Sequence, residues 1–126
     1  MRDPSSPRRM LITGGTSGIG AGIAAAFAAL GDAVTITGAT PAEVERARGD
    51  AALAGTTGHV LDVRDGGAVA SFVAGLGELD VLVNCAGMVR RGAEHDPAAF
   101  ADTVDVNLNG TMRVCAAARP GLAARG

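Results

Sequence analysis

Short apolar runs alternate with longer segments of helical period along this chain, and this alternation constrains the fold more than any other feature. The runs are four to six residues long and lie at residues 9–13, 34–37, 59–63 and 79–84. After each run, apolar residues recur every three or four positions. Such a pattern is typical of β-α-β units wound on a parallel sheet, so we expect four strands and four helices.

The first two helices are marked at their ends by residues with specific backbone roles. The stripe expected on the first helix consists of Ile19, Ile23, Phe27 and Leu30. Gly31 ends this helix, because glycine readily adopts the left-handed conformation found there. Thr40 and Glu43 form a capping box with Pro41 at the first helical position, which predicts a second helix running toward Leu53 before the next glycines break it.

The last two helices are predicted in the same way. Asp65 can cap the third helix. Its buried face is expected to contain Val69, Phe72, Val73 and Leu76. A loop at residues 85–95 precedes the last helix, which starts at Asp96 and Pro97. One face of that helix carries Phe100, Val104, Leu108 and Met112. Pro120 should kink or end it, because proline lacks the backbone N–H that a helix interior needs.

Composition limits the chemistry that this chain can perform. All 11 basic residues are Arg, and the chain contains no Lys, Tyr or Trp. A Schiff-base lysine, a phosphate-loop lysine and a phenolic acid are therefore excluded within it. With 19% charged residues and a net charge of -2, we expect an ordered chain with no nucleic-acid partner. No apolar run approaches the roughly 20 residues that span a bilayer, so we expect no membrane partner.

The length of 126 residues suits one domain, and no repeat or shift in composition marks a second. Residues 1–8, which contain Pro and Ser, are expected to form a flexible tail ahead of a domain at residues 9–126. The two cysteines, Cys85 and Cys115, form no C-x-x-C motif, and the chain has only two histidines. This predicts neither a disulfide scaffold nor a metal site, and reduced thiols fit a cytoplasmic location best.

A glycine-rich turn at residues 13–20, Thr-Gly-Gly-Thr-Ser-Gly-Ile-Gly, joins the first strand to the first helix. At such a junction, backbone N–H groups and the positive end of the helix can bind an anion, and glycine lets a pyrophosphate approach the backbone. An NTPase phosphate loop is excluded, because Ala21 and Gly22 replace the required Lys and Ser or Thr. The strict G-x-G-x-x-G pattern also fails at Ile23, which leaves G-x-x-x-G-x-G. By itself, this turn could also be a purely structural connection.

Three further motifs accompany the turn, in order along the chain. They are Leu61-Asp62-Val63 after the third run, Asn84-Cys85-Ala86-Gly87 after the fourth, and Asn107-Leu108-Asn109-Gly110 in the last helix. Together the four motifs closely resemble the classical short-chain dehydrogenase/reductase family, over residues 9–126 but only over its N-terminal, cofactor-binding half. The resemblance implies a Rossmann-like, doubly wound parallel sheet of order 3-2-1-4, truncated before the later strands.

The resemblance also implies which residues bind a nicotinamide dinucleotide. The pyrophosphate and ribose would be bound by Gly14, Ser17, Gly18, Ile19 and Gly20. Asp62 would accept a hydrogen bond from the adenine amino group, with Val63 lining that pocket. The adenine ribose would lie over Asn84, Ala86 and Gly87. Cys85 replaces an Asn that is often found in the family, and we expect this to be harmless because Cys behaves as a small buried apolar residue.

Asn107 matches the family's catalytic Asn, whose backbone distorts the helix and which holds a water of the proton relay. Two simpler roles stay open at this point. Asp62 could only cap a turn, and Asn107 could be a polar residue that bends a helix.

The end of the second strand bears on the choice between NAD and NADP. NAD enzymes of this architecture usually carry Asp or Glu there, which accepts from the ribose 2′-hydroxyl and would repel a 2′-phosphate. No carboxylate lies between Asp32 and Glu43, and Ser17 and Thr40 could donate to a phosphate. NADP(H) is therefore favoured over NAD(H), although a basic residue often present in NADP-using relatives is also missing.

The resemblance implies that the full-length protein is a homo-oligomeric oxidoreductase that transfers hydride between the dinucleotide and a small carbonyl/alcohol substrate. The family's acid/base pair, Tyr-x-x-x-Lys, is absent here, so we expect the 126-residue chain alone to be inactive. The chain would then be a fragment or a truncated product. A non-catalytic dinucleotide-binding module or sensor is the first alternative. A methyltransferase is the second, but it leaves the motif at residues 84–87 and Asn107 without a role.

Overall fold

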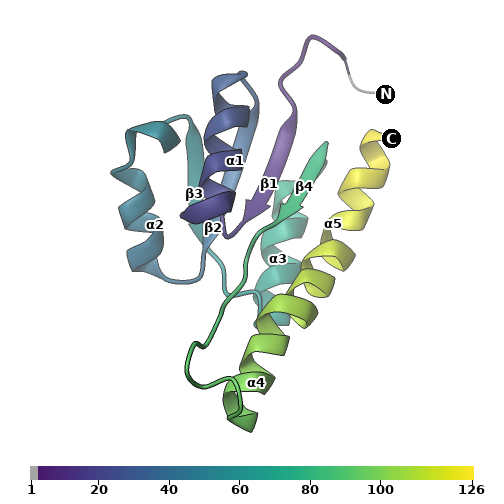
Figure 1. Ribbon diagram of the computed structural model, residues 1–126. Coiled ribbons are helices and arrows are strands. Elements are labelled where there is room, and N and C mark those ends of the chain that lie inside the picture. Colours follow the sequence, from purple (N-terminus) through teal and green to yellow (C-terminus); the bar gives the residue numbers. More distant parts are fainter. Residues whose placement is uncertain (1–2) are drawn as a thin grey trace.

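Residues 3–126 are described by the computed structural model, which arranges them as one parallel sheet with helices on both faces (Figure 1). The strands are β1 (Arg9–Thr13), β2 (Ala33–Gly38), β3 (Thr56–Val60) and β4 (Val81–Asn84), in the order β3-β2-β1-β4. Within this sheet, Leu11 of β1 pairs with Thr35 of β2 on one side and with Leu82 of β4 on the other. The predicted α/β class and strand order are confirmed.

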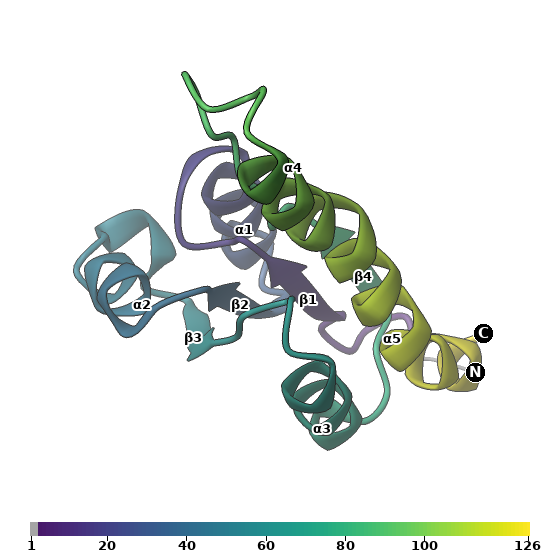
Figure 2. The ribbon, with the colours of Figure 1, turned by 90° about the horizontal axis from the view of Figure 1, so that it is seen from below.

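The helical segments connect the strands and cover the sheet. They are α1 (Gly18–Ala29), α2 (Pro41–Arg48), a 3₁₀ turn (Ala51–Leu53), α3 (Gly66–Leu76), α4 (Pro97–Val104), a π-helical turn (Asp105–Gly110) and α5 (Thr111–Arg125). The last three follow one another without a break and form one rod at residues 97–125 (Figure 2). α1 and α3 lie on opposite faces of the sheet in the same view.

The core has one part on each face of the sheet. The first part, between the sheet, α1 and α2, contains Met10, Ile12, Ala24, Val34, Ile36, Ala47 and Leu53. The second part, between the sheet, α3 and α5, contains Leu11, Leu61, Val63, Val69, Val73, Leu79, Val114 and Ala118. Successive residues of β1 therefore point to opposite faces, and all of them after Arg9 are buried, as expected for a strand that is covered on both sides.

The predicted N-terminal caps of α2, α3 and α4 and the glycine after α1 agree with the structure. The Thr40 hydroxyl accepts from the Glu43 N–H at 3.3 Å while the Glu43 carboxylate accepts from the Thr40 N–H at 2.8 Å, which is the expected capping box. The carboxylates of Asp65 and Asp96 cap α3 and α4. Gly31 has a φ of 87°, the left-handed value expected after α1.

The position of the third strand was predicted wrongly. We expected residues 59–63, but β3 spans Thr56–Val60, and α2 ends at Arg48 instead of continuing toward Leu53. Gly58 lies inside β3, opposite Ile36, where a Cβ would come within 3.2 Å of the Val44 side chain of α2. This glycine therefore lies within a strand, where it permits a close helix–strand contact, and does not mark the end of the second helix.

The expected stripe of α1 is only half correct. Ile23 and Phe27 pack against the core, but Ile19 and Leu30 are 81% and 73% exposed. The most buried residues of α1 are instead Gly20 and Ala24. Small side chains face the sheet because α1 passes so close that a Cβ on Gly20 would collide with the Gly14 carbonyl.

The apolar face predicted for the last helix is also exposed. Phe100, Leu108 and Met112 are each more than 60% exposed, and the buried positions are Ala99, Gly110, Val114 and Ala118. Small residues again bring the rod close to its neighbours. Pro120 does not end the helix, which continues to Arg125.

The segment before β1 makes specific contacts. The Arg8 guanidinium forms an ion pair with Asp32, and the Ser5 hydroxyl and backbone N–H both donate to Asp3. Residues 1 and 2 of the expected tail lie outside the described residues. The flexibility of residues 1–8 stays a prediction.

Candidate functional site

A cleft of about 570 Å³ opens where the carboxyl ends of the strands meet the rod. Its walls come from the glycine turn, the end of β2, the segments after β3 and β4, and the π-helical turn. All of the predicted site residues except Thr40 and Asn84 line it. Four motifs that are far apart in the sequence are thus brought to one place, as the carboxyl edge of a parallel sheet does.

The glycine turn owes its shape to missing side chains. Gly14 and Gly18 have φ values of 63° and 56°, which disfavour other residues. A Cβ on Gly14 would lie 2.6 Å from the Ala86 N atom, so the turn presses directly against the segment after β4. That segment is also held by a hydrogen bond from the Ala86 N–H to the buried Thr13 hydroxyl at 3.3 Å.

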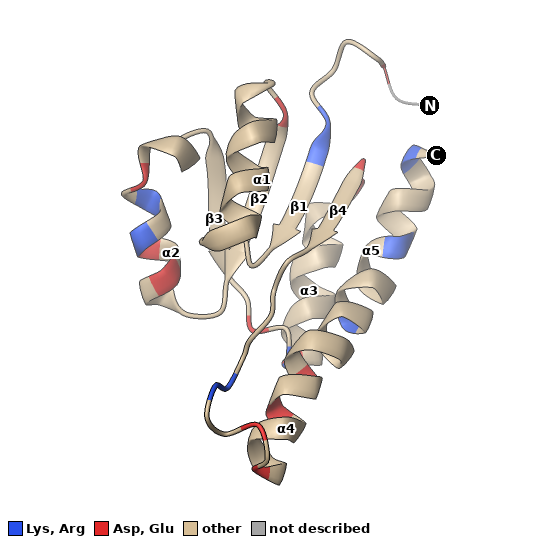
Figure 3. Cartoon of the chain, in the orientation of Figure 1, with Lys and Arg blue, Asp and Glu red and all other residues tan. Residues whose placement is uncertain are grey.

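The N-terminus of α1 opens into the same cleft. Ser17 is its N-cap residue, and its side chain makes no capping hydrogen bond. The first-turn N–H groups of a helix have no acceptor within the helix, and they give this end a partial positive charge. No acidic residue lies in the first turn, and α1 carries no charged side chain at all (Figure 3). The end of α1 is therefore suited to an anionic group such as a phosphate.

Asp62 is already held by its neighbour Arg64. The Asp62 Oδ2 atom lies 2.8 Å from Arg64 Nη2, and Oδ1 accepts from the Arg64 N–H at 3.0 Å. The hydrogen bond from the Arg64 side chain is the main cause of a lowered Asp62 pKa, so this carboxyl stays ionised. Asp62 thus caps a turn, the simpler of its two roles, while still lining the cleft.

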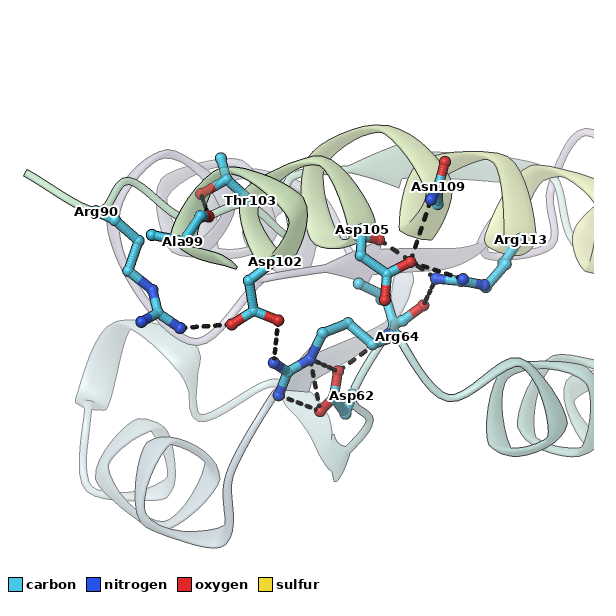
Figure 4. A network of polar contacts seen from close by, with 10 residues as sticks. Asp62, Arg64, Arg90, Ala99, Asp102, Thr103, Asp105, Asn109 and Arg113 are labelled. Atoms are coloured by element: carbon cyan, nitrogen blue, oxygen red, sulfur yellow. Dashed lines mark hydrogen bonds and ion pairs between the residues drawn. The ribbon is translucent and has the colours of Figure 1, made fainter. Parts of the chain in front are cut away.

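Arg64 extends this contact into a network that reaches the rod (Figure 4). Its Nη1 atom lies 3.0 Å from Asp102 Oδ1, and the other oxygen of Asp102 lies 2.6 Å from Arg90 Nη2. The two carboxylates raise the pKa of Arg64, Asp62 contributing most. The segment after β3 is therefore linked through α4 to the loop after β4.

Asn107 lies within the π-helical turn, so the expected distortion of the helix at this residue is present. Its Oδ1 atom accepts from the Met88 N–H at 2.8 Å, and its Nδ2 atom donates to the Met88 carbonyl at 3.0 Å. The side chain therefore orients the loop after β4 as well as lining the cleft. A smaller hollow of about 220 Å³ shares Met88, Val89 and Asn107 with the cleft.

The two predicted residues outside the cleft have other contacts. Thr40 is engaged in the capping box with Glu43. Asn84 donates from Nδ2 to the Cys115 sulfur at 3.3 Å, and its buried Oδ1 atom has no hydrogen-bond partner among the described residues.

The sequence analysis did not predict several residues of the cleft, among them the charged residues Glu43 and Arg64. The full set is Thr16, Thr37, Gly38, Ala39, Glu43, Leu61, Arg64, Cys85, Met88, Val89 and Val106. The capping box carried a signal for Glu43, because the third residue of a helix that opens just after β2 must lie near the end of that strand. A Cβ on Gly38 would come within 2.9 Å of the Thr16 side chain and 3.1 Å of the Glu43 Cβ.

A family model described as short chain dehydrogenase matches residues 8–126. The chain belongs to the short-chain dehydrogenase family. It is 36% identical to 2-keto-3-deoxy-L-fuconate dehydrogenase of Xanthomonas campestris pv. campestris, over 94% of this chain and 40% of that protein. It is also 36% identical to a 3-dehydrosphinganine reductase of Arabidopsis thaliana, over 97% of this chain and 39% of that protein.

A solved structure shows the same arrangement. The 2-keto-3-deoxy-D-gluconate dehydrogenase of Streptococcus agalactiae superposes on this chain with a TM-score of 0.79 and 31% sequence identity. The match covers 94% of this chain and 48% of that one. This chain therefore spans less than half the length of the two curated relatives and about half of this structure.

Residues 3–126 contain neither a membrane-spanning helix nor a cluster of metal ligands. None of the described helices is both long and apolar enough to cross a membrane. No three His, Cys, Asp or Glu side chains are grouped so that they could hold a metal ion in this part of the chain.

Proposed function

We propose that this chain is the cofactor-binding half of an NAD(P)-dependent oxidoreductase. The whole protein would transfer hydride between the dinucleotide and a carbonyl/alcohol substrate. The observation that carries this proposal is the single cleft in which the glycine turn, Asp62, Val63 and Asn107 meet. The relatives support it, since those named above are called dehydrogenases or a reductase.

The residues of the cleft fit a dinucleotide. The glycines leave room at the end of α1, where a pyrophosphate would accept from the first-turn N–H groups. The Asp62 carboxylate already accepts from three N–H groups of Arg64. Because a carboxylate can accept about four hydrogen bonds, one acceptor position would be left for the adenine amino group. Asn107 would lie toward the reacting end, beside the smaller hollow. When bound, the nicotinamide ring supplies the hydride.

The preference for NADP(H) stays a prediction, and Glu43 bears on it. No carboxylate lies between Asp32 and Glu43, but Glu43 itself lines the cleft beside Gly38. Its charge opposes a 2′-phosphate, whereas Ser17 lies in the same cleft and could donate to one. The homo-oligomeric state and the cytoplasmic location also stay predictions.

The test is a calorimetric titration of the 126-residue chain with NADP(H), NAD(H) and S-adenosylmethionine. We expect a dinucleotide to bind and S-adenosylmethionine not to bind. Gly18→Ala should abolish binding, since Gly18 is the first residue of α1 and lines the cleft, where a methyl group would take up space that the phosphate needs. Gly31→Ala is the matched control, because it carries the same positive-φ strain away from the cleft. Equal losses in both variants, or preferential binding of S-adenosylmethionine, would contradict the proposal.

A dinucleotide sensor would give the same titration result, so a second measurement separates the two functions. The chain contains no Tyr and no Lys, and the loss of a positioned general acid costs about 10²–10⁴-fold in rate. We expect the chain alone to oxidise NAD(P)H no faster than buffer with a panel of ketones and aldehydes. A longer gene product containing Tyr-x-x-x-Lys should turn over, whereas a sensor would not.

A further inference from the structure

The π-helical turn is a local departure from α geometry in the middle of the rod. Such turns are rare, and they need contacts that a regular helix does not. The turn presents Asn107 to the cleft, so whatever holds the turn also fixes Asn107. The contacts that hold the turn therefore bear on the position of Asn107.

Arg113 supplies these contacts, although it does not line the cleft itself. Its Nη2 atom lies 2.7 Å from Asp105 Oδ1, and its Nη1 atom donates to the Asp105 carbonyl at 3.3 Å. The Asn109 side chain donates to the same Asp105 oxygen at 3.2 Å, as Figure 4 shows. Asp105, the first residue of the π-helical turn, is thus held by the side chain of Arg113, which lies in α5 after the turn has ended.

The same guanidinium also connects the π-helical turn to the segment after β3. Arg113 Nη1 donates to the Val63 carbonyl at 3.1 Å. The contact there is close, since a Cβ on Gly110 would lie only 2.5 Å from Val63 Cγ2. Arg113 therefore fixes the turn against the segment after β3, one wall of the cleft.

We infer that Arg113 is a positioning residue, which holds the π-helical turn in the register that directs Asn107 to the Met88 main chain and the cleft. A shift of one residue in helical register rotates a side chain by about 100°, since a turn contains 3.6 residues. Without Arg113, the turn loses its tie to the Val63 carbonyl and to Asp105, and the two Asn107–Met88 hydrogen bonds weaken. The importance of this placement for hydride transfer rests on the proposed function, but the placement itself does not.

The chain offers an unusually clear spectroscopic test. It contains three Asn residues and no Gln, so the side-chain amide region of a ¹⁵N–¹H spectrum holds only Asn84, Asn107 and Asn109. In Arg113→Met, which keeps an apolar stem, we expect the Asn107 amide pair to shift toward free-amide positions. Its hydrogen exchange should accelerate about tenfold, as loss of one to two net hydrogen bonds implies. The Asn84 pair, which contacts Cys115, should stay in place and report that the fold is intact.

Two further variants complete the test. Arg119→Met removes an exposed arginine from the same helix and should leave the Asn107 pair unchanged. Arg113→Lys keeps the charge near Asp105 but lacks the planar fork that reaches two carbonyls, so it should give an intermediate shift. If Arg113→Met does not fold, Arg113→Lys decides. An unmoved Asn107 pair in either folded Arg113 variant, or an equal shift in Arg119→Met, overturns the inference. The experiment uses no dinucleotide, so a failure to bind cofactor would not affect its result.

Discussion

The glycine turn before α1 and the π-helical turn after α4 both line the cleft, but they are held in place by different means. The glycine turn is fixed by backbone conformation and by the lack of side chains at Gly14 and Gly20. The π-helical turn is fixed by charged and polar side chains, chiefly Arg113 and Asp105. The first kind of support is steric and insensitive to the solvent, whereas the second responds to charge, salt and pH. We therefore expect the two sides of the cleft to fail under different conditions.

The largest effect is expected for Gly14→Ala. The new methyl group would lie 2.6 Å from backbone atoms of Cys85 and Ala86, at a φ of 63° that disfavours side chains. Left-handed strain and overpacking together should lower the free energy of unfolding by about 2–5 kcal/mol, independently of salt. Urea unfolding measures this. Gly22→Ala, on exposed helical backbone of α1, is the control and should be neutral or stabilising.

A smaller effect is expected on cofactor choice at the end of β2. Ala39→Asp places a carboxylate in the cleft and should shift the ratio of the two dissociation constants toward NAD(H) by about tenfold, or ~1.4 kcal/mol. Position 39 is preferred to Gly38, where a Cβ is crowded by Thr16. Glu43→Gln retains the capping box and should shift the ratio the opposite way.

Glu45→Gln is the control for this comparison, since Glu45 pairs with Arg48 and does not line the cleft. Native binding that is tighter for NAD(H) would show that the predicted preference for NADP(H) is wrong. An unchanged ratio in both cleft variants would show that neither position faces the 2′ group.

A still smaller effect is expected for Asp102→Asn, which removes one carboxylate from between Arg64 and Arg90. Exposed ion pairs contribute little to stability and are screened by salt. The melting temperature should fall by less than in Gly14→Ala, and the difference from the parent chain should vanish in 1 M NaCl. A salt-independent loss would mean that Asp102 acts through packing.

The pH dependence gives the smallest expected effect. Arg64 and Arg113 lower the pKa values of Asp62 and Asp105 by hydrogen bonding to their carboxylates. A carboxyl group whose pKa is lower in the folded than in the unfolded state stabilises the fold at pH values above its unfolded-state pKa of about 3.9. This stabilisation is lost as the pH falls through the pKa of the folded state. Melting temperatures should therefore be level near neutral pH and fall in acid. The Asp62→Asn/Asp105→Asn variant should show a shallower acid decline, and an unchanged decline would refute this assignment.

Contacts between residues close in the sequence could be predicted well, whereas contacts between residues far apart in the sequence could not. The caps at Thr40, Asp65 and Asp96 are contacts between residues close in sequence, so their pattern can be read directly. In β3, by contrast, Gly58 pairs with Ile36 of β2 and lies close to Val44 of α2, and no local pattern records these contacts.

The apolar stripes failed for a related reason. Ile19 looks like a core residue by spacing, yet Gly20 and Ala24 are the buried residues because α1 passes close to the glycine turn. Phe100 is likewise exposed, and the buried residue of α4 is Ala99. In the site, the contacts of Arg64 with Asp102 and of Arg113 with Val63 could not be predicted, because they join residues 38 and 50 positions apart. Motifs identified the residues of the cleft, but the side chains that hold them there are found only in three dimensions.

The pairing of β1 with β4 has a consequence for the order of folding. Met10 pairs with Val34 in β2 but also with Val81 in β4, across a much longer stretch of chain. Long loops close slowly, because their conformational entropy is lost before any contact is gained. The β1–β2–β3 part can thus assemble first, while Gly14 meets its neighbour Ala86 only once β4 has joined the sheet. We therefore expect the cleft to be completed late, and during synthesis the glycine turn emerges long before the partner that gives it its final shape.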